Sequence, residues 1–127
     1  MSSVFAYDPS DAEWEILQAI WALQPVTVRG VYERIAEKKD VGYTTVLKQM
    51  QRLTEKGILE KDAAEGAHLY RSKLPEMEAK SQFAQKVLHT AFGGSTINLL
   101  LHALGNDESS VEELKTLKAW LDQQTGI

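Results

Sequence analysis

The chain has 127 residues, 43% of them hydrophobic and 25% charged. These values are ordinary for a folded protein and disfavour a disordered or collagen-like chain. Cysteine is absent, which excludes disulfides, thiolate metal sites and cysteine catalysis. No uncharged apolar run approaches the roughly 20 residues that a membrane helix needs, and the N-terminus lacks the basic and apolar regions of a signal peptide. We therefore expect a cytoplasmic protein without a membrane segment.

The charged residues are distributed unevenly. The net charge is −4, from 14 basic and 18 acidic residues, and this balance alone disfavours nucleic acid as a partner. Between residues 38 and 56, however, basic residues clearly outnumber acidic ones. Because binding uses a local patch, this segment is a candidate for a nucleic-acid contact. Its basic residues are Lys38, Lys39, Lys48, Arg52 and Lys56.

Two helices are predicted at the start of the chain. Ser10 followed by Glu13 is a capping box, and the helix that it begins ends before Pro25. Thr27 is a suitable cap for a second helix over about 28–38. This second helix is close enough in sequence to the third, which is expected over about 44–56, to form a helix-turn-helix unit with it.

A third helix and a β-hairpin follow. The helix is expected over about 44–56, with Gly57 at the position where helices commonly end. Residues 58–61 and 68–72 are typical of two strands, joined by a turn over 62–66. The buried stripe of the third helix consists of Val46, Met50 and Leu53.

Three helices and a two-stranded wing indicate a winged helix-turn-helix. The predicted fold is therefore mainly α with a small β-hairpin: a winged-helix DNA-binding domain over residues 1–75, followed by an α-helical dimerisation domain over 76–127. In such a fold the third helix enters the major groove of DNA with its N-terminal end first.

The exposed face of the third helix carries the side chains that base recognition needs. Arg and Lys pair with guanine, Gln pairs with adenine, and a Thr methyl contacts the thymine methyl. Tyr43 and Arg29 are placed to bind phosphates, and Arg71 flanks the wing, whose tip is acidic. The predicted DNA-binding residues are Arg29, Tyr43, Thr44, Thr45, Lys48, Gln49, Arg52 and Arg71.

The C-terminal part reads as three short helices, over about 76–92, over 96–104 and after Ser110. Helices this short bury little by themselves, and the middle one is apolar nearly all round. A second copy of the chain is the simplest cover, and a two-fold dimer predicts a palindromic operator on double-stranded DNA. The predicted dimerisation residues are Phe83, Val87, Leu88, Phe92, Ile97, Leu100, Leu104, Leu114, Leu117 and Leu121.

No enzyme, cofactor or metal site is predicted. The chain has no nucleophile elbow and no phosphate-binding glycine loop. Its three histidines lie on separate predicted elements, so they do not form a pair with metal-ligand spacing. Two other functions stay open: a winged helix that docks proteins, favoured by the acidic net charge, and a small-molecule-sensing regulator with a pocket between its two domains.

An ordered set of motifs spans almost the whole chain. The motifs are Asp11-Ala12-Glu13-Trp14-Glu15-Ile16-Leu17 with Trp21 and Pro25, Tyr43-Thr44-Thr45-Val46 with Arg52-Leu53 and Glu55-Lys56-Gly57, then Tyr70, Gly94-Ser95 and Glu112-Glu113-Leu114. In this order they resemble the BlaI/MecI/CopY family of penicillinase and copper-responsive repressors. The resemblance implies a homodimeric repressor that binds an inverted-repeat operator. It also implies that Tyr43, Thr44, Thr45, Lys48 and Arg52 are the recognition-helix residues.

The chain departs from the resemblance in its recognition helix and at the positions where members of the family receive their inducing signals. The penicillinase branch tends to carry lysine at the position of Thr44 and a polar residue at that of Leu47, so its operator is not carried over. Its Asn–Phe cleavage bond falls on His102-Ala103, and the paired cysteines of copper-responsive members are missing. Neither inducer is therefore carried over to this chain, and a sensor protease is left open as a partner.

Overall fold

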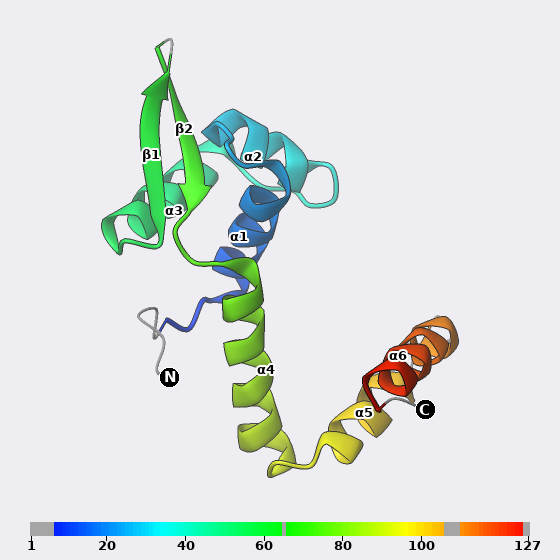
Figure 1. Cartoon of the computed structure of the whole chain (residues 1–127). Helices are drawn as coiled ribbons and strands as arrows, with labels where there is room; N and C mark the ends of the chain where they lie inside the picture. Colours follow the sequence, from blue (N-terminus) through cyan, green and yellow to red (C-terminus); the bar gives the residue numbers. More distant parts are fainter. Residues whose placement is uncertain (1–6, 65, 106–109, 126–127) are drawn as a thin grey trace. The chain divides into compact units, whose positions relative to one another are not determined.

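The computed structural model describes residues 7–64, 66–105 and 110–125 (Figure 1). The chain divides into two compact units, Met1–Gln82 and Phe83–Ile127. The first six elements are α1 (Asp11–Leu23), α2 (Val28–Ala36), α3 (Tyr43–Glu55), β1 (Leu59–Ala64), β2 (Ala67–Ser72) and α4 (Glu76–Phe92); α5 (Thr96–Leu104) and α6 (Ser110–Thr125) follow. This confirms a mainly helical chain with one hairpin, an order consistent with a winged helix followed by a helical segment.

The predicted domain division at residues 75 and 76 falls at the start of α4, whereas the two compact units meet within that helix. Helix α4 therefore begins in the first unit and ends in the second. The division into a DNA-binding and a dimerisation domain stays a prediction.

Helix α1 begins as predicted. The Ser10 Oγ accepts the Glu13 N–H at 3.2 Å, and the Glu13 carboxylate accepts the Ser10 N–H at 2.9 Å. The helix buries Leu17 and Ile20 completely. The Trp21 indole N–H donates to the carbonyl oxygen of Leu74 at 3.0 Å, which fixes the segment between the wing and α4 onto α1.

Helix α2 is capped by Thr27, whose Oγ1 accepts the Gly30 N–H at 3.1 Å. It ends at Ala36, two residues before the predicted end. The chain continues as a hydrogen-bonded turn, in which the Ile35 carbonyl accepts the N–H groups of both Lys38 and Lys39 at 3.1 Å. The predicted helix over 28–38 is therefore too long.

Helix α3 packs its predicted stripe, Val46, Met50 and Leu53, into the core. It ends in a Schellman motif, with Gly57 at a φ of 82°. The Ile58 N–H donates to the Leu53 carbonyl and the Gly57 N–H to the Thr54 carbonyl, each at 3.0 Å. Because Leu53 and Ile58 are both buried, this motif also directs the chain into the wing.

The wing is an antiparallel pair in which Leu59 lies opposite Ser72 and Ala64 opposite Ala67. The predicted turn over 62–66 is thus wrong, because Asp62 and Ala63 belong to the ladder. The other edge of β2 is covered by Val26, whose N–H and carbonyl both bond to the backbone of Tyr70, at 3.0 and 2.7 Å.

One continuous hydrophobic core holds the first unit together. It takes residues from α1, α2, α3 and the wing, and it includes Tyr70 of β2 and Ala79 of α4. The core therefore fixes α3 between α1 and the wing and leaves one face of α3 in solvent.

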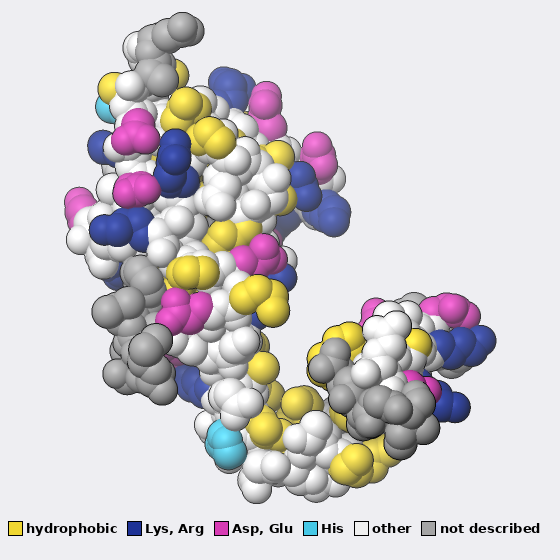
Figure 2. Space-filling view, in the orientation of Figure 1, with side chains coloured by type: hydrophobic (Ala, Val, Ile, Leu, Met, Phe, Trp, Pro, Cys, Tyr) yellow, Lys and Arg dark blue, Asp and Glu magenta, His cyan; other side chains and the backbone are white. Residues whose placement is uncertain are grey.

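The second unit is built differently. Ser95 caps α5 by accepting the Asn98 N–H at 3.2 Å. Helix α5 nevertheless buries none of its residues in the single chain. Figure 2 shows hydrophobic side chains gathered along this part of the chain, where α4 ends and α5 follows.

Candidate nucleic-acid interface

The face of α3 opposite the core carries most of the predicted base-reading residues. Thr44, Lys48 and Arg52 follow one another at intervals of four residues, and all three are exposed. No acidic residue occurs in α3 before Glu55. Phosphates that flank a groove would therefore meet cationic and neutral side chains along more than two turns of this helix.

An aromatic and cationic cluster lies at the N-terminal end of α3. The ring of Tyr43, which is 41% exposed, contacts the Tyr32 ring of α2 edge to face, with centroids 5.7 Å apart. The Arg29 guanidinium lies 5.8 Å from the same Tyr43 ring. Arg29 also faces Glu33 at 3.7 Å, an exposed pair. The structure thus brings the two predicted phosphate contacts, Arg29 and Tyr43, together.

Gln49 lies away from the middle of this face. It is half-buried and, with Thr45, lines a hollow of about 190 Å³ whose other walls include Glu15 of α1 and Lys39. Gln51 is exposed on the other flank of α3. The structure therefore places Gln51, which the sequence analysis did not select, nearer to the wing than Gln49.

The wing and α3 enclose a second hollow of about 370 Å³. Its lining includes polar residues that sequence reasoning did not select, and for Lys61 and His68 the signal is the alternation of the strands. Lys61 and His68 share a face of the hairpin with buried Tyr70, so both point to the helix side. The polar lining residues are Thr27, Arg29, Tyr43, Gln51, Lys61, His68 and Tyr70.

Arg71 lies on the opposite face of the hairpin from Lys61. It is opposite Glu60 in the ladder, and its guanidinium lies 3.5 Å from the carboxylate of Asp62. Its positive charge is therefore partly compensated by the acidic side chains of β1. A DNA contact of Arg71 stays a prediction.

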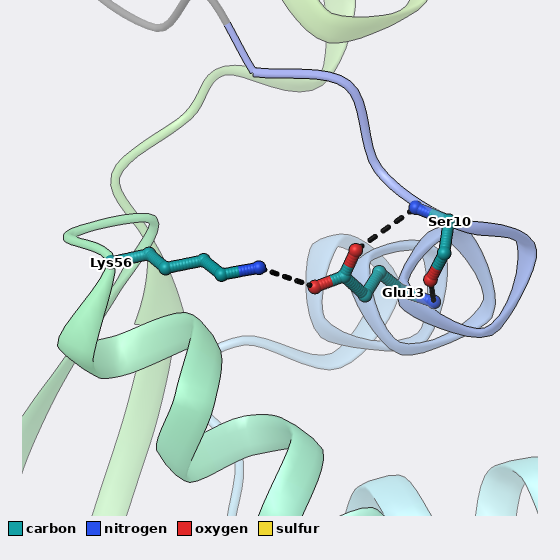
Figure 3. A network of polar contacts seen from close by, with 3 residues as sticks. All are labelled: Ser10, Glu13 and Lys56. Atoms are coloured by element: carbon teal, nitrogen blue, oxygen red, sulfur yellow. Dashed lines mark hydrogen bonds and ion pairs between the residues drawn. The ribbon is translucent and has the colours of Figure 1, made fainter.

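A polar network ties the end of α3 to the start of α1 (Figure 3). The Lys56 ammonium donates to the Glu13 carboxylate at 3.3 Å, the same group that accepts the Ser10 N–H. The ammonium also lies 5.2 Å from the centroid of the Tyr7 ring. These contacts join three segments of the chain around one carboxylate.

The electrostatics of this network favour ionised Glu13. Burial by itself raises the pKa of the Glu13 carboxyl, but the hydrogen bonds from the Ser10 N–H and the Lys56 ammonium, the nearby Tyr7 hydroxyl and the positive charge of Lys56 together lower it by more. The pKa of Glu13 falls from 4.5 to about 2. The same environment, through burial first and then Glu13, raises the pKa of Tyr7.

The predicted dimerisation residues are incompletely buried in the single chain wherever their side chains are described. Phe83 is 44% exposed and Ile97 is 67% exposed. Leu101, which sequence reasoning did not select, is 64% exposed. The half-buried residues are Val87, Leu88, Phe92, Leu100, Leu104 and Leu117, while the side chains of Leu114 and Leu121 lie outside the described residues.

Among the described residues, no group of three His, Asp or Glu side chains is arranged to hold a metal ion. His102 instead contacts the Phe92 ring, with ring centroids 5.5 Å apart, and its Nδ1 lies 2.9 Å from the Asn98 carbonyl oxygen. None of the helices in the described part of the chain is long and apolar enough to span a membrane.

Comparison with known proteins decides the family. The family model described as penicillinase repressor matches residues 9–123, which is most of the chain. The chain belongs to the penicillinase repressor family. It is similar to a penicillinase repressor of Staphylococcus aureus, with 28% identity over 109 residues and 86% of each chain covered.

Two further relatives also match this chain over most of its length. The methicillin resistance regulatory protein MecI of Staphylococcus aureus (strain N315) is 24% identical over 93% of this chain and 96% of its own length. The penicillinase repressor of Bacillus licheniformis is 24% identical, and the match covers 90% of this chain and 89% of its own length. This family consists of transcriptional repressors, not enzymes, so the predicted repressor class is supported.

Proposed function

We propose that this penicillinase repressor family member is a homodimeric, sequence-specific repressor that binds an inverted-repeat operator and regulates its own promoter. The observation that carries the proposal is the exposed face of α3, which presents Thr44, Lys48 and Arg52 with no acidic residue before Glu55. A helix in the major groove needs such a face, because it must read base edges between two rows of phosphates.

Each group has a role in this proposal. Lys48 and Arg52 donate to O6 and N7 of guanine, and the Thr44 methyl contacts the methyl of thymine. Arg29 and Tyr43, at the positive N-terminal end of α3, hold a phosphate and set the position of the helix along the groove. Lys61 of the wing contributes further positive charge on the same side.

Dimerisation is supported by the apolar surface of the second unit. Ile97 and Leu101 are 67% and 64% exposed, on a helix that buries none of its residues. An isologous contact between two copies would cover this surface and place two α3 helices about a two-fold axis. The two half-sites would then lie one turn of DNA, about 34 Å, or a multiple of it apart.

Release from DNA is proposed to act through the second unit. When the dimer is weakened, each protomer binds its half-site alone, and the gain in affinity from binding both half-sites together is lost. Position 102–103 carries His-Ala, and the chain has no cysteine, so the signal is proposed to differ from Asn–Phe cleavage and from copper binding by cysteines.

The test is fluorescence anisotropy with the full-length protein and DNA from upstream of its own gene, beside a scrambled fragment, at two salt concentrations. We expect tight binding to the upstream fragment alone, weakening steeply with salt as several phosphate contacts require. Sedimentation of the same sample should give a dimer. Equal weak binding to both fragments would contradict the proposal that the protein regulates its own promoter. Failure to bind any genomic fragment even at low salt would contradict the proposal that it is a DNA-binding repressor.

A further inference from the structure

A cleft lies within the first unit, on residues that the DNA-binding proposal does not use. Its walls come from α1, α2 and the first turns of α4, and its volume is about 290 Å³. This volume is just below the range of typical small-molecule sites, about 300–1,000 Å³, so the cleft suits a small ligand. The lining residues are Glu15, Gln18, Ala19, Arg34, Ile35, Lys38, Glu76 and Lys80.

Two ion pairs neutralise part of the charge around the cleft. Glu15 accepts from the Lys39 ammonium at 2.7 Å, and Glu76 accepts from the Lys80 ammonium at 2.6 Å. Both carboxylates of the lining therefore have a cationic partner. The remaining charge of the lining is positive and lies on α2 and the turn that follows it.

That charge belongs to Arg34, which lies on α2, and to Lys38, which lies four residues later in the turn that follows the helix. Within residues 7–64, 66–105 and 110–125, neither has a carboxylate within ion-pair distance. Both side chains line the same cleft and are exposed to solvent. An anion that enters the cleft therefore meets two cations that no carboxylate of the described chain compensates.

The cleft also offers apolar surface beside these cations. Ala19 of α1 is buried and Ile35 of α2 is half-buried against the core, so the two form an apolar part of the lining. An inorganic anion would use only the charged part of the site. A ligand that matches the whole lining has an anionic group and a compact apolar body.

We propose that this cleft binds a small organic anion, a carboxylate or phosphate ester with an apolar body. Arg34 holds the anionic group through its planar guanidinium and Lys38 adds a second charge. The ligand body lies against Ala19 and Ile35. Because the walls include both α2 and α4, a bound ligand contacts the helix-turn-helix and the helix that continues into the second unit.

The site is tested by binding alone, so the result does not depend on DNA recognition. Full-length ¹⁵N-labelled protein is titrated with phenyl phosphate and followed by NMR, with benzyl alcohol as the neutral control. We expect saturable shifts of the amides of Ala19, Ile35 and Lys38 with phenyl phosphate, and none with benzyl alcohol.

Two variants complete the test. Arg34→Gln combined with Lys38→Gln should weaken phenyl phosphate about 10-fold or more, since charge-assisted hydrogen bonds are lost. Lys115→Gln, which removes an exposed lysine of α6, should leave the affinity unchanged. The proposal is overturned by shifts that do not saturate, or by equal affinity of the double variant and the wild type; in either case DNA binding can still be intact.

Discussion

Replacing Glu13 by Gln should remove a pH-dependent part of the stability of the fold. The variant keeps a side-chain oxygen for the Ser10 N–H, because Gln also serves in a capping box. It loses the charge that the Lys56 ammonium faces at 3.3 Å. The experiment thus isolates the ionic part of the network that connects α1 to the end of α3.

The magnitude follows from the pKa of Glu13. The fall of the pKa from 4.5 to about 2 corresponds to an upper limit of about 3.4 kcal/mol, at about 1.36 kcal/mol for each pKa unit. The Glu13 side chain is only 14% exposed, but that of Lys56 is 45% exposed, so solvent screens the pair. We expect the variant to lose about 1–2 kcal/mol of unfolding free energy at neutral pH.

The sign of the pH dependence is determined by the lowered pKa. Ionised Glu13 stabilises the folded state fully above the unfolded-state pKa of 4.5, and the contribution is lost as the pH falls through about 2. This contribution is measured by urea unfolding of the wild type and of Glu13→Gln at pH values between 7 and 3. The difference in stability should be largest at pH 7 and shrink below pH 4.5.

A matched control is Glu37→Gln, which changes an exposed carboxylate at the end of α2. This substitution should alter stability by less than about 0.5 kcal/mol. A Glu13→Gln variant as stable as the wild type at pH 7, or a difference that does not change down to pH 3, would refute the reasoning.

Three further substitutions test the packing. Gly30→Ala places a Cβ 2.7 Å from a methyl of Val26, so thermal unfolding should show a loss of about 1–3 kcal/mol despite the better helix propensity of Ala; a gain in stability would contradict the packing. Leu53→Ala, at a fully buried position of α3, should cost about 2–5 kcal/mol in urea unfolding, and a loss below 1 kcal/mol would count against it. Leu101→Asp should give monomers by sedimentation while the first unit stays folded, and an unchanged dimer would remove α5 from the interface.

Much of the fold could be predicted from local signals. The capping box at Ser10, the cap at Thr27 and Gly57 after α3 each depend on hydrogen bonds between near neighbours, and the structure confirms all three. Two predicted bounds differ from the structure. Helix α2 ends at Ala36, two residues before the predicted end, and the cross-strand ladder with β2, which local propensity does not show, extends β1 beyond Lys61.

The candidate site could be predicted only in part. Helical periodicity identifies the exposed face of α3, but it does not say which flank faces the wing. That depends on the packing of α1 and the hairpin on either side, which places Gln49 beside α1 and Gln51 toward Lys61. Strand alternation could have separated Lys61 from Arg71, once the register of the hairpin was known.

The central claim is that the exposed face of α3 reads DNA. It is tested most directly by anisotropy of Lys48→Ala and Arg52→Ala on the operator fragment, with Lys115→Ala as the control on α6. If both residues contact bases, each variant should lose about 1–3 kcal/mol of binding free energy, while the control binds like the wild type. Wild-type affinity of both α3 variants would contradict the claim.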